Sequence, residues 1–297
     1  MVALAGCSDA PPNRLQRPNL VQLDQAGNLL VVDMPSGRVV RFSPDGRFLG
    51  AIGRKGLDRG QLWRPWGVCE LPDGRIGVIN HSLRNINDAN SLHREVKVFD
   101  RAGNEQLAFP IVAPGMDSLG WPQDLEVVPG GFVVGEQQHN ALLIFDFEGG
   151  FVRSLHEIEG GPPLVSPGSP QFVDGSIWIA EYRSHRIRRI TLEGRQEVSF
   201  GSEGDGPGQL LFPQAVSVHP DGWLVVADLG NFRIVRFDLQ GRYLDHFAPE
   251  PVSPDTRVQL MDVSVGKDGQ VYAADSKGGR IVVWKPGVGL VRTISDW

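Results

Sequence analysis

The sequence is poor in cysteine, in positive charge and in long apolar runs, and each shortage excludes a class of protein. Two cysteines in 297 residues cannot form the disulfide framework of small secreted domains. Lys and Arg number 29 against 35 Asp and Glu, so the net charge is −6 and a nucleic-acid partner, which needs a basic face, is not expected. No apolar run reaches the roughly 18 residues that a transmembrane helix needs.

Glycine and proline are abundant instead, with 37 and 22 residues, and the glycines recur in a fixed pattern. Six times a glycine precedes an apolar stretch, and an acid or its amide stands six residues after it. The pairs are Gly27 and Asp33, Gly74 and Asn80, Gly130 and Glu136, Gly175 and Glu181, Gly222 and Asp228, and Gly269 and Asp275. A period of about 40–50 residues predicts a repeat architecture, which closes into a single domain.

Each repeat divides into four short strands by its pattern of apolar residues. The first strand is expected to start at Pro18, Pro65, Pro122, Pro170, Pro213 and Leu260, since proline at the first position of a strand removes no ladder hydrogen bond. The second strand is nearly all apolar, as in a strand covered on both faces, and the third alternates.

Four such antiparallel strands, polar at the outer edge, predict one propeller blade. The sequence therefore predicts an all-β fold, a six-bladed β-propeller of four-stranded antiparallel blades over residues 18–297, after an N-terminal tail of residues 1–17. Because the sixth repeat contains all four strands, the ring is expected to close by packing blade six on blade one, without strand exchange.

A glycine-rich linker joins some of the repeats. Residues Gly53 to Pro65 match residues Gly201 to Pro213 with three glycines, a Gln-Leu pair and the proline in register. A strand, an acid, a short loop and Arg-Ile follow, as in Asp228 to Ile234. This pattern resembles the NHL-repeat family, and the resemblance covers residues 18–297. It implies a six-bladed propeller, in which the mouth of the channel is the expected binding site.

The N-terminal tail carries a second resemblance. Leu4-Ala5-Gly6-Cys7 is similar to the lipobox of bacterial lipoproteins, in which the cysteine is lipidated, and a polar, proline-rich spacer follows it. The resemblance implies a protein of the bacterial periplasm or cell surface that meets the membrane only through a lipid on Cys7. The alternative is a disordered start with a free thiol. Cys69 stands in an apolar strand, where we expect a buried, inert thiol.

The candidate ligand-binding residues follow from the propeller geometry. Strand one begins, and strand two ends, on the same face, so the residue after each strand-one start should face the channel mouth. These residues are Asn19, Trp66, Gln123, Gln171, Gln214 and Met261. Peptidyl-hydroxyglycine amidating lyases, which share the architecture, have zinc histidines there, and this sequence has none. The amides, together with Trp66 and Trp121, favour a module that binds a protein segment, a glycan or a small ligand.

An enzymatic alternative depends on the acids that end strand two. Lactonase and esterase propellers hold a divalent cation near the axis, and Asn80, Glu136 and Glu181 offer oxygen ligands suited to Ca²⁺ or Mg²⁺. A metal-dependent lyase or lactonase-like hydrolase is therefore the second hypothesis. The competing interpretation is structural: the acid accepts hydrogen bonds from its own loop and from the following arginine, as Asp228 and Arg233 could.

The second repeat contains an insertion, residues 80–93, which is about ten residues longer than the corresponding loops. We expect it to overhang the mouth, because it joins strands two and three on the same face as Trp66 and Gln123. His81 and Arg84 are its candidate ligand contacts, since long loops on a rigid scaffold are often functional. The alternative is a tolerated surface insertion, because loop length costs little stability.

Overall fold

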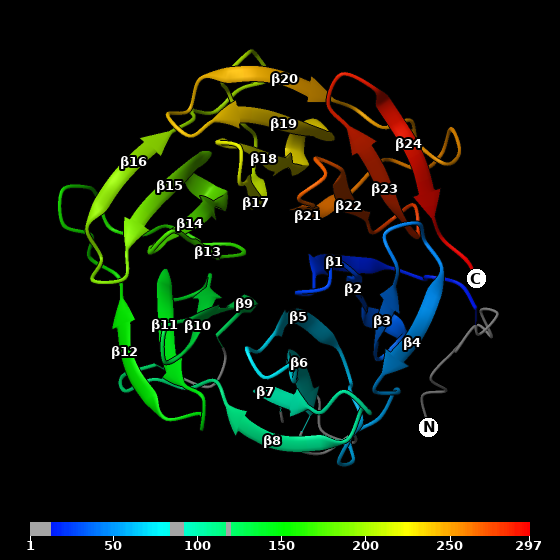
Figure 1. Cartoon of the computed structure of the whole chain (residues 1–297). Helices are drawn as coiled ribbons and strands as arrows, with labels where there is room; N and C mark the ends of the chain where they lie inside the picture. The colour runs from blue at the N-terminus through cyan, green and yellow to red at the C-terminus, as the bar shows by residue number, and fades with distance from the viewer. Residues whose placement is uncertain (1–12, 84–91, 117–119) are drawn as a thin grey trace, which may run out of the picture.

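Six four-stranded antiparallel sheets stand in a ring in the computed structural model, which describes residues 13–83, 92–116 and 120–297 (Figure 1). This arrangement confirms the predicted all-β fold and the six-bladed β-propeller. Within the described residues the helical segments are three 3₁₀ turns, and no helix is long and apolar enough to cross a membrane. Cys7 and Arg84 lie outside the described residues.

The strands follow one another in chain order from the centre of each blade outward. Blade one comprises β1 (Pro18–Leu23), β2 (Leu29–Asp33), β3 (Arg38–Phe42) and β4 (Phe48–Ile52); blade two β5 (Pro65–Glu70), β6 (Ile76–Leu83), β7 (Leu92–Phe99) and β8 (Glu105–Pro110); blade three β9 (Pro122–Val128), β10 (Gly131–Glu136), β11 (Ala141–Asp146) and β12 (Phe151–Leu155); blade four β13 (Gln171–Val173), β14 (Ser176–Glu181), β15 (Arg186–Thr191) and β16 (Gln196–Phe200); blade five β17 (Pro213–His219), β18 (Trp223–Asp228), β19 (Arg233–Asp238) and β20 (Tyr243–Phe247); and blade six β21 (Leu260–Val265), β22 (Val271–Asp275), β23 (Arg280–Lys285) and β24 (Gly289–Ile294). The 3₁₀ turns η1 (Met34–Ser36), η2 (Tyr182–Ser184) and η3 (Leu229–Asn231) connect strands two and three of blades one, four and five.

The hydrophobic core is divided among the contacts between neighbouring blades. Every residue of β2 is buried, because its side chains alternate between the blade before it and the blade after it. Val31 of β2 belongs to the cluster shared with blade six, and Val32 belongs to the cluster shared with blade two. The buried clusters at the other blade contacts have the same construction. Each blade is therefore held on both sides, which explains the nearly continuous apolar sequence of the second strands.

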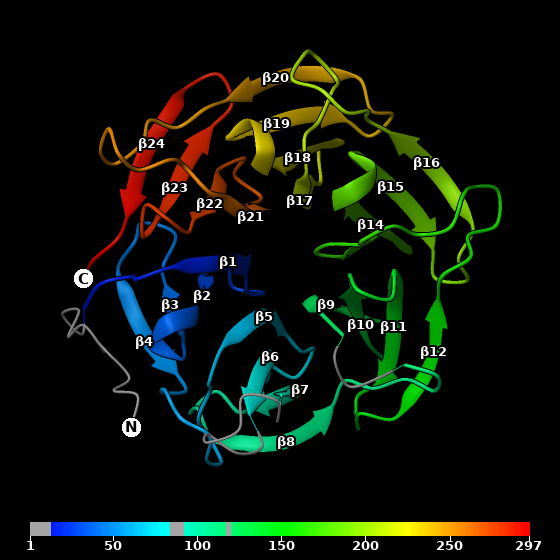
Figure 2. The same ribbon diagram turned by 180° about the vertical axis from the view of Figure 1, so that it is seen from behind.

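The ring closes where blade six packs on blade one, as predicted, and no strand is exchanged between them (Figure 2). The segments outside the blades reinforce this contact. Leu15 N donates to Ser295 O at 2.7 Å, and Trp297 N donates to Asn13 O at 2.9 Å. The indole of Trp297 stacks on Phe48 with ring centroids 5.1 Å apart. The two ends of the described chain thus seal the ring against its first blade.

The first strand of blade four does not start where the sequence predicted. In the other blades, the predicted strand start pairs with the acid or amide that follows the turn glycine by six residues, as Pro18 pairs with Asp33; we call this acid or amide the ring acid. In blade four, Pro167 forms the bridge to Glu181, and β13 begins only at Gln171. The prediction of Pro170 was wrong because two prolines stand three residues apart, and the Pro-Gln pair resembled the other copies. The residue at the mouth position is therefore Gly168, and a Cβ there would lie 2.4 Å from Gln214 O.

Candidate binding site at the channel mouth

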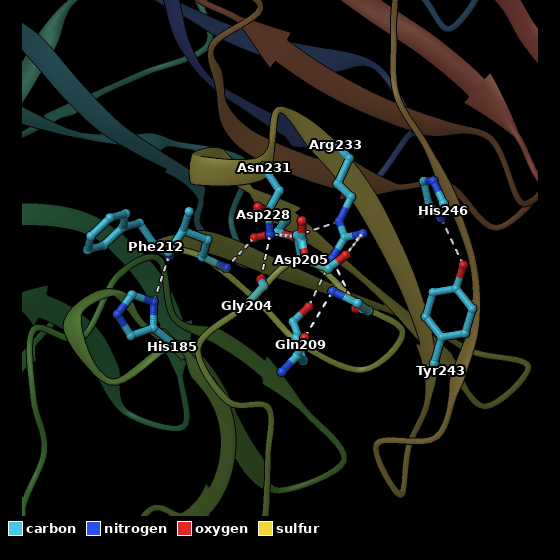
Figure 3. Close-up of polar contacts among 12 residues, drawn as sticks. His185, Gly204, Asp205, Gln209, Phe212, Asp228, Asn231, Arg233, Tyr243 and His246 are labelled. Carbon is cyan, nitrogen blue, oxygen red and sulfur yellow. Dashed lines mark hydrogen bonds and ion pairs between the residues drawn. The ribbon is translucent and has the colours of Figure 1, made fainter.

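The acid that ends each second strand organises its own blade. Asp228 Oδ1 accepts a hydrogen bond from Leu211 N at 2.7 Å, and Oδ2 accepts from Asn231 Nδ2 and Arg233 Nε, both at 2.8 Å (Figure 3). Arg233 also donates to the carbonyl oxygens of residues 205, 206 and 209 in the glycine-rich linker. The acid and the arginine therefore fold the linker onto the blade, which supports the structural interpretation of this position.

Blade three lacks the arginine, and a histidine takes its place. Glu136 Oε2 accepts from His139 N at 2.7 Å and contacts His139 Nδ1 at 2.8 Å, while Oε1 accepts from Trp121 N and from Gln138 N. The carboxyl group is 2% exposed. Glu136 is thus fully occupied by its own loop and by the residue that precedes β9.

Asn80 and Glu181 have partners of the same kind. Asn80 Oδ1 accepts from the backbone N–H groups of Trp63 and Arg64, and Glu181 Oε1 accepts from Val165 N. No hydrogen bond joins these two residues to each other or to Glu136. Over residues 13–83, 92–116 and 120–297, no group of three or more His, Cys, Asp or Glu side chains could hold a metal ion. The geometry therefore gives no support to a Ca²⁺ or Mg²⁺ site at Asn80, Glu136 and Glu181.

Four of the predicted mouth residues form one hydrogen-bonded chain. Asn19 Nδ2 donates to Trp66 O at 3.0 Å, and Trp66 Nε1 donates to Gln123 Oε1 at 3.2 Å. Gln214 Nε2 donates to the same Gln123 oxygen at 3.0 Å. The chain connects blades one, two, three and five, so the mouth is crossed by amide groups that are largely committed to one another.

The other two predicted mouth residues lie apart from this chain. Gln171 stands farther along its strand because of the register of blade four, and its amide bonds Ser217 Oγ and Val218 N. Met261 follows the first residue of β21 and is half-buried. The structure therefore brings together Asn19, Trp66, Gln123 and Gln214 of the six predicted positions.

An aromatic cluster adjoins the amide chain above blades two and three. The imidazole of His81 lies parallel to the indole of Trp66, with centroids 5.4 Å apart and planes 2° apart, and Trp121 meets it edge-on at 5.2 Å. His81 Nε2 lies 3.0 Å from the carbonyl oxygen of Pro122, so this nitrogen carries the proton. Burial, and then the charge of Arg94, lowers the pKa of His81 to about 3. The imidazole is therefore neutral at physiological pH.

The insertion extends the hairpin of blade two beyond its ring acid. β6 and β7 stay paired past Asn80 and Glu95, with His81 opposite Arg94 and Leu83 opposite Leu92. The ends of the insertion are thus strand, where the sequence predicted loop, and its central residues 84–91 lie outside the described residues. This pairing places Arg94, from the far side of the insertion, beside His81.

Arg94 is one of the site residues that were not predicted from the sequence. Its side chain is buried, with the guanidinium 5.4 Å from the Trp121 ring centroid and Nε donating to Gly120 O at 3.2 Å. Its Nη1 is buried and has no hydrogen-bond partner among the described residues. Burial, and then the charge of Arg64, lowers the pKa of Arg94. The signal in the sequence was indirect, since it required the pairing of residues across the insertion.

These side chains surround a cavity of about 260 Å³ at the edge of the mouth. Its lining consists of Trp63, Arg64, His81, Ser82, Leu83, Leu92, Arg94 and Trp121. Aromatic and aliphatic walls with a few converging polar groups are the usual composition of a ligand pocket. We call this cavity the blade-two pocket.

Deeper along the axis, the inner strands carry three carboxyl groups around a cavity of about 30 Å³. Asp262 Oδ2 accepts from Val21 N at 2.9 Å, Asp124 Oδ1 accepts from Val68 N at 3.2 Å, and Glu126 Oε2 accepts from Gln22 Nε2 at 2.8 Å. Burial raises the pKa of Glu126 and of Asp262 to about 8, and burial with the nearby Asp262 raises that of Asp124. We call these three residues the axial carboxyl group: the two aspartates join neighbouring inner strands, Glu126 of blade three reaches Gln22 of blade one, and burial favours the protonated form of all three.

The fold and the mouth define a six-bladed β-propeller with a lateral pocket. No family model matches the chain, and no curated protein matches it. Among solved structures, the chain is similar to a virginiamycin B lyase from Staphylococcus aureus, with a TM-score of 0.62 and 14% identity over 95% of this chain and 86% of that chain. It is also similar to a chain of a nidogen/laminin complex, with a TM-score of 0.66 and 13% identity over 90% of this chain and 92% of that one. At such identities, these likenesses show the fold alone.

Proposed function

We propose that this propeller is a binding module of the NHL type whose ligand occupies the blade-two pocket. The observation that carries the proposal is the convergence, in one 260 Å³ cavity, of indole rings and an arginine with an unpartnered N–H group. The ring acids and most of the mouth amides are hydrogen-bonded within the fold. In contrast, Nη1 of Arg94 has no hydrogen-bond partner among the described residues. Among the residues that the structure describes, no specific contact favours the metal-dependent lyase or hydrolase that the acids first suggested.

The rigidity of the site supports a binding role. His81 is held between Trp66, Trp121 and the Pro122 carbonyl group, and both tryptophans are tied to the scaffold by the contacts of blades two and three. A pocket whose side chains are fixed before binding loses little conformational entropy when a ligand enters. The site therefore suits a small molecule or a short protein or glycan segment.

We also propose that the full-length protein is a lipid-anchored protein of the bacterial periplasm or cell surface, with the lipid on Cys7. The support is the lipobox-like Leu4-Ala5-Gly6-Cys7 ahead of a polar spacer. Membrane partition of the full precursor expressed in a bacterium should be lost on Cys7→Ser. Unchanged partition of that variant would refute the anchor.

The binding site can be tested with three simple probes: indole, N,N′,N″-triacetylchitotriose and a capped Gly-Trp-Gly peptide. Saturation-transfer NMR should detect binding of at least one probe, and Trp121→Ala should remove it. The matched control is Trp223→Ala, because Trp223 also contacts a histidine ring, that of His219, with centroids 4.4 Å apart, and lies under an arginine, Arg236. Binding that survives Trp121→Ala, or no binding of any probe, would overturn the proposed site.

A further inference from the structure

The guanidinium group of Arg94 is the feature of the blade-two pocket that the fold itself does not explain. The residue is only 4% exposed, yet no carboxylate among the described residues forms an ion pair with it. Its Nε donates a hydrogen bond to Gly120 O, and the guanidinium lies over the ring of Trp121. Nη1 has no hydrogen-bond partner among the described residues. A buried cationic group with an unsatisfied donor is costly and calls for an explanation, and in Arg94 this group lines a cavity that a ligand could enter.

The charges around Arg94 favour an anion. Among the described residues, the lining of the pocket includes two arginines, Arg64 and Arg94, and no Asp or Glu. Glu136, whose charge acts on Arg94 from blade three, is already engaged by Trp121 N, Gln138 N and His139. His81 is neutral and hydrogen-bonded to Pro122 O, so it does not compete for the anion as a second cation.

We propose that the blade-two pocket recognises the carboxylate of an aromatic or apolar ligand, with the carboxylate on Arg94 Nη1 and the apolar part against the indole of Trp121. This inference rests on the proposed binding function and adds the ligand class. The unpartnered Nη1 of one buried arginine, beside largely apolar walls of Trp63, Leu83 and Leu92, matches a singly charged group on an apolar body. A phosphate ester shares the anionic oxygens but carries more charge and more acceptors than this donor set can satisfy.

The test compares three ligands of one shape with the wild-type protein: indole-3-acetate, indole-3-acetamide and 3-indoxyl phosphate. Titration by ligand-observed NMR at pH 7 should give a Kd for the acetate at least about tenfold lower than for the neutral amide, a difference of about 1.4 kcal/mol. The phosphate should bind no more tightly than the acetate. Equal affinity for acetate and amide, or a clear preference for phosphate, would overturn the carboxylate assignment.

Variants connect this preference to Arg94. Arg94→Gln should reduce the acetate-to-amide ratio to about one, whereas Arg94→Lys should retain part of it, because the charge remains but the planar donor pair is lost. The matched control is Arg236→Gln, since Arg236 also lies over an indole, that of Trp223 at 5.3 Å, but on another blade. That control should keep the wild-type ratio.

The outcomes separate the two proposals. If both acetate and amide bind, with equal affinity, and Trp121→Ala removes both, the binding site is supported and the role of Arg94 is refuted. If the acetate preference persists in Arg94→Gln, the anion binds elsewhere and the inference fails. If the wild-type protein binds none of the three ligands at millimolar concentration, both the carboxylate assignment and the use of the pocket for aromatic ligands are overturned. Near-UV circular dichroism establishes that each variant keeps its tertiary packing, and the wild-type comparison does not depend on any variant.

Discussion

Gln214 of blade five donates a hydrogen bond to Gln123 of blade three, across the mouth and past the whole of blade four. The mouth position of blade four, between these two residues, is Gly168, where an added Cβ would lie 2.4 Å from the backbone oxygen of Gln214. The amides thus link the blades across the axis, and the pocket with unused hydrogen-bonding capacity lies to the side, over blade two. Hydrogen-bonded amides therefore cross the mouth of this propeller, and the candidate ligand site lies beside the mouth, over blade two.

Replacing the shared acceptor should weaken the ring. Gln123→Ala removes the partner of both Trp66 Nε1 and Gln214 Nε2, so we expect a loss of about 1–3 kcal/mol in the free energy of unfolding. Urea denaturation followed by circular dichroism measures it. The exposed Gln240 provides the control, and Gln240→Ala should change stability by no more than about 0.5 kcal/mol. Equal effects of the two variants would contradict a structural role for the amide chain.

Arg94 and Arg233 are both buried, but substitution should cost much less stability at Arg94 than at Arg233. Arg233→Gln breaks the ion pair with Asp228 and several bonds to linker carbonyls, so we expect it to cost about 3–5 kcal/mol. Arg94→Gln removes a charge that has an unpaired donor, so stability should change by less than about 1 kcal/mol in either direction. Thermal unfolding of the two variants side by side tests this contrast, and a large loss in Arg94→Gln would show that the guanidinium is structural.

The axial carboxyl group should make the protein less stable as pH rises. The pKa of Glu126 is raised in the fold from 4.5 to about 8, so the folded state holds a proton that the unfolded state releases within this range. The stability contributed by this proton is complete below about pH 4.5 and declines as pH rises toward 8. Glu126→Gln should therefore raise the free energy of unfolding at pH 8 by on the order of 1–3 kcal/mol, with little gain at pH 4.5. An identical effect at both pH values would show that Glu126 is ionised in the fold.

Gly168 should be intolerant of even one methyl group. Its added Cβ would lie 2.4 Å from the backbone oxygen of Gln214, so Gly168→Ala forces blades four and five apart and should cost about 2 kcal/mol or more. The control is Gly206→Ala, because the Cβ there would meet only the mobile end of the Gln209 side chain, at 2.9 Å. Differential scanning calorimetry should show a larger decrease in Tm for Gly168→Ala, and equal decreases would remove the packing argument.

The blades could be predicted from the sequence because each repeat contains its own turn glycines and its own acid or amide. The spacing from Gly222 to Asp228 recurs in every copy and depends on local geometry alone. The strand start of blade four was mispredicted because Pro167 and Pro170 both suit that position, and the bridge from Pro167 to Glu181 decides between them. This pairing, and the close contact of Gly168 with Gln214 that goes with it, are tertiary features that a local sequence pattern does not contain.

The candidate site was harder to predict than the fold for a related reason. Of its members, the sequence indicated His81, Trp66 and Trp121, because they stand next to a proline or in the insertion. Arg94 lies thirteen positions beyond His81 and reaches it only because β6 and β7 stay paired past the ring acid. Whether a long insertion continues a ladder or leaves it depends on tertiary contacts, so the residue that matters most to the proposed ligand was not visible in the repeat pattern.

The neutral carboxyl groups at the axis make unfolding a proton-releasing reaction. At pH 7, Glu126 and Asp262 are mainly protonated in the fold, with pKa values of about 8, and burial also favours the protonated form of Asp124. In the unfolded chain the same groups ionise, so their protons pass to the buffer. The calorimetric enthalpy of unfolding at pH 7 should then differ between phosphate and Tris, because Tris takes up protons with a much larger release of heat. The inner strands thus couple the opening of the propeller to the acidity of the surrounding solution.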